Sequence, residues 1–156
     1  MTEEQIMDHI VEGTKEAIEQ GGGPFGAAIV IDGKIIAEGY NEVYQNGDPT
    51  AHAEIQAIRK AAVSLGVHFP KGTKLYSTSQ SCPMCLAAAL WAGIDEIVFG
   101  ASCEFDETVG MGDAPVYAYL RGDEDPEVLR QRSVCAKKAE EMLKWFEKRQ
   151  NNENSR

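Results

Sequence analysis

The chain has 156 residues, 43% of them hydrophobic, and its 25 acidic and 15 basic side chains give a formal net charge of −10 at pH 7. This length and apolar content suit one folded unit with a real core, so we expect a single domain over residues 1–156. The negative charge argues against nucleic acid as a partner, because a protein that neutralises many phosphates needs a basic surface.

The amino-terminal stretch is acidic, and no long apolar run occurs in the chain. We therefore expect neither a secretory signal nor a membrane span. Cysteines occur at positions 82, 85, 103 and 135. So small a number in a reducing compartment favours metal binding or catalysis over a disulfide framework, and we expect a cytoplasmic protein.

The first predicted elements are a helix and a hairpin. Thr2 and Gln5 form a capping pattern, and the helix that they begin ends at the glycines of residues 21–23. Residues 27–41 contain two β-rich runs joined by Asp32-Gly33, a dipeptide typical of a tight hairpin turn.

Strands and helices alternate after the hairpin. A helix is predicted to begin between Thr50 and His52, because apolar residues recur at helical spacing as far as Leu65. Residues 74–80 are typical of a strand, and the helix after them has a proline in its first turn, where the missing N–H costs nothing. Residues 95–101 indicate a buried strand. This alternation predicts an α/β fold with a partly parallel sheet.

The chain changes character after residue 100. Eight acidic residues and one basic residue, Arg121, lie between positions 101 and 127. We expect a loop there, with a short helical piece around residues 116–120. An amphipathic helix follows over residues 134–150, and the remainder to residue 156 is typical of a frayed tail.

Two short motifs carry the chemistry. His-Ala-Glu at 52–54 and Cys-Pro-Met-Cys at 82–85 each stand at the start of a predicted helix. His52, Cys82 and Cys85 make three ligands suited to Zn²⁺, and a catalytic zinc takes three protein ligands and leaves its fourth position open. Free N–H groups at helix starts also favour thiolates. An H-x-E motif followed by C-x-x-C is typical of zinc deaminases that act on nucleobases.

Two interpretations from other classes compete with a zinc enzyme. In one, zinc only stabilises the fold of a binding domain, and in the other, Cys-Pro-Met-Cys is the redox motif of a thiol oxidoreductase. A structural zinc needs a fourth protein ligand, and the segments around the two motifs offer no obvious one. An oxidoreductase would have no use for His52 and Glu54. We therefore favour the zinc enzyme.

Four stretches make the chain similar to a known superfamily: "GGPFGAAIV", "NGDPTAHAEIQAIRKA", "LYSTSQSCPMCLAAALWAG" and "IVFGA". They resemble successive blocks of the cytidine deaminase-like superfamily, and within it most of all the short bacterial guanine deaminases. The resemblance covers residues 1–120 well and the rest loosely. It implies a three-layer α/β/α fold with a mixed five-stranded sheet, hydrolytic removal of an exocyclic amine, and a homodimer that exchanges carboxy-terminal segments.

The resemblance also implies roles for individual residues. His52, Cys82 and Cys85 are implied as the zinc ligands, and Glu54 as the carrier of protons between water, the ring nitrogen and the departing ammonia. The residues implied in substrate binding are Asn41, the backbone N–H of Ala53, Phe25, Asp113 and Trp91.

The identity of the base is the least specific part of this prediction. Our first choice is free guanine, converted to xanthine and ammonia, with a small-molecule nucleobase as partner and neither nucleic acid nor membrane. The alternatives are cytosine, guanosine, another aminated heterocycle, and adenosine in tRNA, for which the chain lacks a basic surface. Gln80-Ser81 also stands before Cys82 where close relatives have Glu-Pro.

Overall fold

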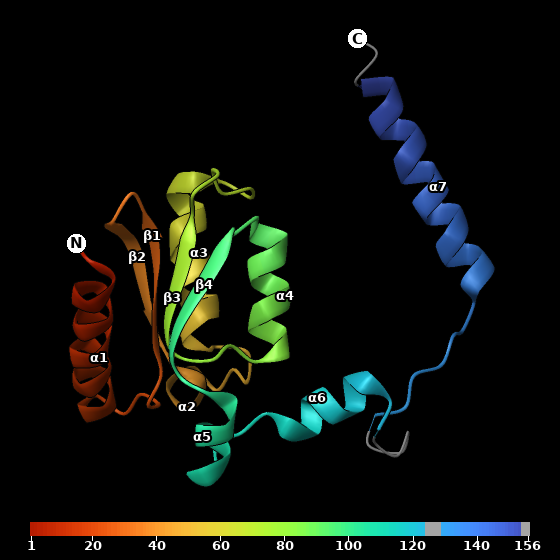
Figure 1. Cartoon of the computed structure of the whole chain (residues 1–156). Helices are drawn as coiled ribbons and strands as arrows, with labels where there is room; N and C mark the ends of the chain where they lie inside the picture. Colours follow the sequence, from red (N-terminus) through yellow and green to blue (C-terminus); the bar gives the residue numbers. More distant parts are fainter. Residues whose placement is uncertain (124–128, 154–156) are drawn as a thin grey trace.

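The protein is described from a computed structural model, which defines residues 1–123 and 129–153 (Figure 1). At its centre is a mixed sheet with the strand order β2-β1-β3-β4. β1 (Gly26–Ile31) pairs antiparallel with β2 (Lys34–Tyr40) and with β3 (Lys74–Ser79), and β3 pairs parallel with β4 (Glu96–Ala101). The β1–β2 hairpin confirms the prediction made from Asp32-Gly33, where both residues have positive φ, as a tight hairpin turn requires.

Helices cover both faces of the sheet and give the predicted three layers (Figure 1). On one face lies α1 (Glu3–Glu19), whose Thr2 cap and Gln5 form the expected capping box. On the other face lie α3 (Ala53–Leu65) and α4 (Pro83–Ala92). The apolar residues between the sheet and these two helices include Ala27, Ile29, Ala57, Leu75 and Ala89.

α3 packs unusually close to the sheet because β2 carries a glycine beneath it. A Cβ atom added to Gly39 would lie 2.2 Å from the carbonyl oxygen of Ala53 and 2.3 Å from the backbone nitrogen of Ala57. No side chain fits in that space, so the backbones of the helix and the strand meet directly. This contact sets the position of the amino-terminal end of α3, where His52 and Glu54 lie.

The sheet differs from the expected one in the number of its strands. Four strands occur in the described residues, where the family resemblance implied five. After β4 the chain forms α5 (Cys103–Thr108) and α6 (Ala114–Arg121) instead of returning to pair with the edge of β4. The described segments beyond β4 satisfy their backbone hydrogen bonds within these helices, and β4 remains an edge strand.

The helix α5 lies where we expected only a loop. Ser102 caps it, because its hydroxyl accepts a hydrogen bond from the backbone N–H of Phe105 at 3.3 Å. Glu104 and Asp106 lie in its first turn, where negative side chains stabilise a helix by interacting with the positive end of its dipole. The short helical piece expected around residues 116–120 is confirmed by α6. Residues 124–128 of the acidic segment lie outside the described residues.

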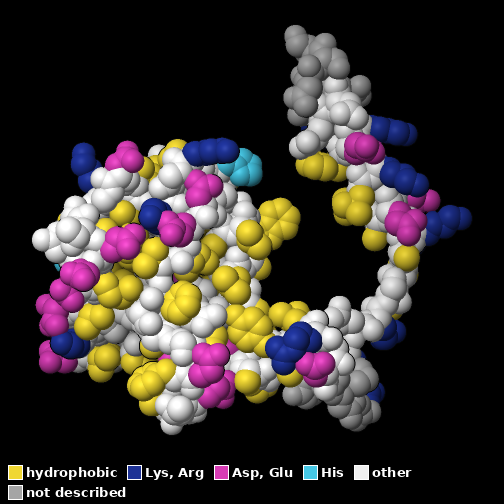
Figure 2. All heavy atoms as spheres, viewed as in Figure 1, with side chains coloured by type: hydrophobic (Ala, Val, Ile, Leu, Met, Phe, Trp, Pro, Cys, Tyr) yellow, Lys and Arg dark blue, Asp and Glu magenta, His cyan; other side chains and the backbone are white. Residues whose placement is uncertain are grey.

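The last helix, α7 (Ala136–Glu153), stands clear of the rest of the chain (Figure 1). It continues past residue 150, where we expected the frayed tail to begin, and residues 154–156 lie outside the described part. Its apolar side chains are exposed, as Figure 2 shows. The largest of them belong to Met142, Leu143, Trp145 and Phe146. None of the helices in the described part is both long and apolar enough to cross a membrane.

Candidate active site

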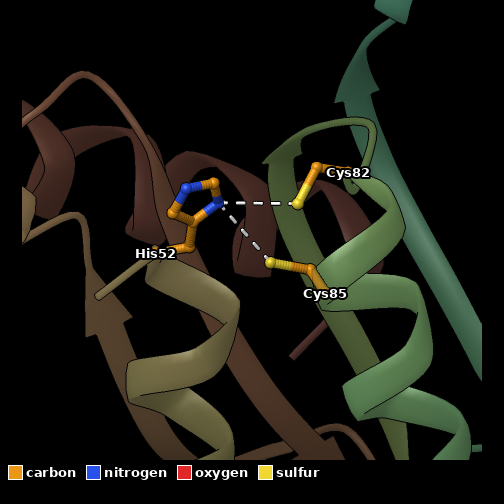
Figure 3. A group of neighbouring side chains, drawn as sticks. All are labelled: His52, Cys82 and Cys85. Atoms are coloured by element: carbon orange, nitrogen blue, oxygen red, sulfur yellow. Dashed lines mark hydrogen bonds between the residues drawn. The ribbon is translucent and has the colours of Figure 1, made fainter. Parts of the chain in front are cut away.

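Two helix starts bring the three predicted zinc ligands together (Figure 3). His52 is the N-cap residue of α3, Cys82 is the N-cap residue of α4, and Cys85 lies in the first turn of α4. The Nδ1 atom of His52 lies 3.6 Å from the Sγ atom of Cys82 and 3.7 Å from the Sγ atom of Cys85. In a tetrahedral zinc site, ordinary Zn–N and Zn–S bond lengths place a nitrogen and a sulfur ligand about 3.6 Å apart. The three residues therefore fit Zn²⁺.

The electrostatics of the site also favour a cation. The hydrogen bond between the two thiols lowers the pKa of Cys82 and raises the pKa of Cys85, so metal-free thiols share one negative charge. The hydrogen bond with Cys82 raises the pKa of His52. Neither His52 nor Cys82 caps its helix through its side chain, so the free N–H groups of both helix starts stabilise negative charge at the ligands. Zinc binding releases the remaining protons.

Glu54 lies beside the ligands without belonging to their group. It is in the first turn of α3, its side chain lines the adjoining pocket, and it is 6% exposed. The hydroxyl of Ser77 in β3 lies 3.5 Å from Glu54 Oε1. Ser77 does not stand in either of the two sequence motifs. The available signal was strand periodicity, which places Ser77 on the same face as the buried Leu75.

A pocket of about 370 Å³ lies next to the three ligands. This volume falls in the range of small-molecule sites. Two of the predicted zinc ligands and four other residues predicted from the sequence line the pocket: His52, Cys82, Glu54, Asn41, Phe25 and Asp113. Gln80, Asp106, Tyr44 and Met111 also line the pocket and were not predicted as substrate contacts.

Asn41 presents a hydrogen-bond donor to this pocket. It is 8% exposed, and its Oδ1 accepts a hydrogen bond from the backbone N–H of Val43 at 3.3 Å. Because an N–H donor pairs with the oxygen end of an amide, the Nδ2 group of Asn41 remains for another partner.

Two of the predicted substrate-binding residues, Ala53 and Trp91, do not line the pocket. The side chain of Ala53 is fully buried and does not line the pocket, but its backbone N–H is the first of α3 and has no acceptor within the helix. Trp91 lies near the end of α4, is 82% exposed, and does not line the pocket of its own chain. The structure therefore does not bring Trp91 to the other predicted residues.

The pocket is acidic. Glu54, Asp106 and Asp113 line it, and its wall contains no lysine or arginine from the described residues. Asp106 is buried and accepts a hydrogen bond from the hydroxyl of Ser79. Partial burial raises the pKa of Asp113. A phosphate-bearing ligand would find no positive side chain here, whereas a ring with N–H donors would find acceptors.

The fold and the three-ligand site are those of a zinc-dependent deaminase, and comparison with known proteins agrees. Residues 1–101 match the cytidine and deoxycytidylate deaminase zinc-binding region. The chain therefore belongs to this family and is a deaminase-family enzyme with a His/Cys/Cys zinc site.

Individual relatives differ in their substrates. The chain is 42% identical to guanine deaminase of Bacillus subtilis over 118 residues, which cover 75% of this chain and 76% of that protein. It is 38% identical to the tRNA-specific adenosine deaminase of Aquifex aeolicus over 101 residues, covering 65% of this chain and 67% of that protein. The X-ray structure of guanine deaminase from B. subtilis matches with a TM-score of 0.80 at 36% identity, covering 97% of this chain and 95% of that one.

Proposed function

We propose that this enzyme is a cytoplasmic guanine deaminase, which hydrolyses free guanine to xanthine and ammonia. The observation that carries the choice of a free base is the acidic pocket, whose described wall holds three carboxylates and no basic side chain. Such a wall disfavours nucleotides and tRNA, because both bring phosphates close to the reacting base. The similarity to B. subtilis guanine deaminase, which extends over nearly the whole of both structures, supports guanine among the free bases.

Glu54 is the proposed proton carrier. His52, Cys82 and Cys85 would hold the zinc ion, which when bound would supply a water molecule whose pKa lies near neutrality. Glu54 takes the proton that the attacking water loses and gives it to the ring nitrogen beside the amine-bearing carbon. It then takes the second water proton and gives it to the leaving amine, which departs as ammonia. The carbon thus exchanges a bond to nitrogen for a bond to oxygen.

The remaining pocket residues are proposed to hold the base. The Nδ2 group of Asn41 and the backbone N–H of Ala53 donate hydrogen bonds to acceptor atoms of the ring. Phe25 packs against the ring, and Asp113 accepts a hydrogen bond from one of its N–H groups.

The proposed activity is tested by measuring ammonia release from guanine, guanosine, cytosine, adenine and an adenosine-containing tRNA anticodon stem-loop. We expect guanine to have by far the highest kcat/KM. A higher kcat/KM for another small molecule would mean that this molecule, and not guanine, is the substrate. Efficient deamination of the RNA, weakened by added salt, would contradict the choice of a free base.

We further propose that the protein is a homodimer whose copies exchange α7. The apolar side chains of α7, among them Trp145 and Phe146, are more than half exposed and need a partner surface, although Arg149 of the same helix lies over the Trp145 ring. A substrate contact of Trp91, which does not line the pocket of its own chain, would be made in the pocket of the second copy.

Light scattering after size-exclusion chromatography should give the mass of two chains, and Trp145→Ser combined with Phe146→Ser should lower this mass. A monomeric mass for the wild-type protein would contradict the dimer.

A further inference from the structure

Gln80 lines the catalytic pocket two residues before the zinc ligand Cys82 and has no part in the proposed proton transfers. Its backbone N–H donates to the carbonyl oxygen of Ala101 at 2.9 Å. Its side-chain Oε1 accepts a hydrogen bond from the backbone N–H of Cys103 at 3.1 Å. Both ends of the residue are therefore held against the segment that follows β4.

The contact with Cys103 decides which end of the Gln80 amide is already engaged. A backbone N–H can only donate, so its partner must be the amide oxygen and not the amide nitrogen. The two ends of a glutamine amide are assigned by such partners. The Nε2 group of Gln80 is therefore the end of the amide that this contact does not engage.

The Nε2 group has no acceptor among the described residues. The only described side-chain polar atom that is both buried and unpartnered is the hydroxyl oxygen of Ser81, so Nε2 of Gln80 is accessible to solvent. Gln80 itself lines the pocket that a substrate would fill. A donor that is held in place before the substrate arrives does not have to be reorganised during binding.

The chemistry of the pocket wall restricts which substrate atom can pair with Nε2 of Gln80. The carboxylates of Glu54, Asp106 and Asp113 offer acceptors, whereas Gln80 offers N–H. Its partner on a planar base must be an acceptor atom, and a carbonyl oxygen is the acceptor that distinguishes keto-bases from their purely aminated analogues. A glutamate at this position could keep the contact with Cys103 but could not donate.

We propose that Nε2 of Gln80 donates a hydrogen bond to the ring carbonyl oxygen of the substrate and thereby selects an aminated keto-base over an aminated base without a carbonyl. This role rests on the proposed function, in which the substrate is guanine. Guanine has one ring nitrogen between its carbonyl carbon and its amine-bearing carbon, so the carbonyl lies close to the reacting amine. Gln80 is then a specificity-determining residue, and the protons are still moved by Glu54.

The variant Gln80→Glu isolates the donor. It retains an oxygen for the N–H of Cys103 and replaces only the NH₂ group by an acceptor. Guanine and 2-aminopurine are the paired substrates, because they carry the same reactive amine and only guanine has the carbonyl. We expect the ratio of their kcat/KM values to fall by about 10- to 100-fold, the effect of losing one buried hydrogen bond. Gln80→Met, which loses both contacts, should lower the ratio similarly and also lower the melting temperature.

A substrate series on the wild-type enzyme tests the same contact if the variants do not fold. 6-Thioguanine keeps the shape of guanine but offers a weak sulfur acceptor, so its kcat/KM should be lower than that of guanine. Equal values for the two substrates would contradict the proposal.

The possible failures can be told apart. Absence of guanine turnover by the zinc-loaded wild-type enzyme contradicts both the proposed function and the role of Gln80. Guanine turnover with a guanine to 2-aminopurine ratio that changes less than about twofold in Gln80→Glu contradicts the role of Gln80 alone. An equal loss of kcat/KM for both substrates also contradicts it, because it would show that Gln80 only supports the segment that carries the zinc ligand Cys82.

Discussion

The hydroxyl of Ser77 and the carboxylate of Glu54 meet across the boundary between β3 and α3, with Ser77 Oγ 3.5 Å from Glu54 Oε1. This is a long hydrogen bond, and both residues are buried. β3 also leads through Gln80 to Cys82. The same strand therefore positions the proposed proton carrier and one zinc ligand relative to each other.

Ser77→Ala should reduce kcat by about three- to tenfold with little change in KM, because it removes one weak hydrogen bond that orients Glu54. Zinc content should stay the same. Ser64→Ala, which changes an exposed serine of α3, is the matched control and should leave kcat unaltered. Steady-state kinetics on the two variants checks this, and an unchanged kcat in Ser77→Ala would show that Glu54 needs no support from β3.

Glu54→Gln should abolish most of the activity while leaving the fold and the zinc in place. The amide is nearly isosteric with the carboxylate, and the three ligands are untouched. General acid–base catalysis contributes about 10²- to 10⁴-fold, and Glu54 is proposed to serve several proton transfers, so we expect a loss at or beyond the upper end of that range. Turnover, zinc content and melting temperature should be measured on the same preparation. A folded, zinc-loaded variant with more than about a tenth of the wild-type turnover would exclude Glu54 as the essential proton carrier.

The purified enzyme should hold about one zinc ion per chain and lose its activity to a chelator. Because the pKa of Cys85 and the pKa of His52 are raised, protons compete for these ligands, and the zinc affinity should fall as the pH is lowered. Titration of the chelator-treated protein with zinc at several pH values measures this. Full activity in a metal-free preparation would refute the zinc mechanism.

Gly39→Ala should destabilise the protein and weaken its zinc site. The added methyl group would meet the backbone of α3, and overpacking of this kind costs about 1–3 kcal/mol in the free energy of unfolding. Gly72→Ala provides a comparison, since a methyl group there meets nothing within 4 Å and only the backbone conformation is strained. Thermal unfolding of the zinc-loaded variants should show the larger loss for Gly39→Ala. An equal or larger loss for Gly72→Ala would contradict the prediction, because Gly39 has no positive φ and only its close contact with α3 can make its substitution costly.

The amino-acid sequence alone determined the features that depend on neighbouring residues. The hairpin follows from Asp32-Gly33, because a tight turn requires a particular backbone conformation at two successive positions. The zinc ligands follow from His52, Cys82 and Cys85, because each stands in a short motif at a helix start and the metal accepts few combinations of residue types.

Only the tertiary structure decided the features that depend on residues far apart in the chain. The support of Glu54 by Ser77 and the orientation of Gln80 by Cys103 each join segments that are more than twenty residues apart, and no local pattern specifies which side chain will face them. The exposed position of Trp91 and the helix α5 in place of further sheet likewise depend on which surfaces pack together. Side-chain hydrogen bonds and strand pairing are short-range in space but not in sequence, so their partners become known only when the chain is folded.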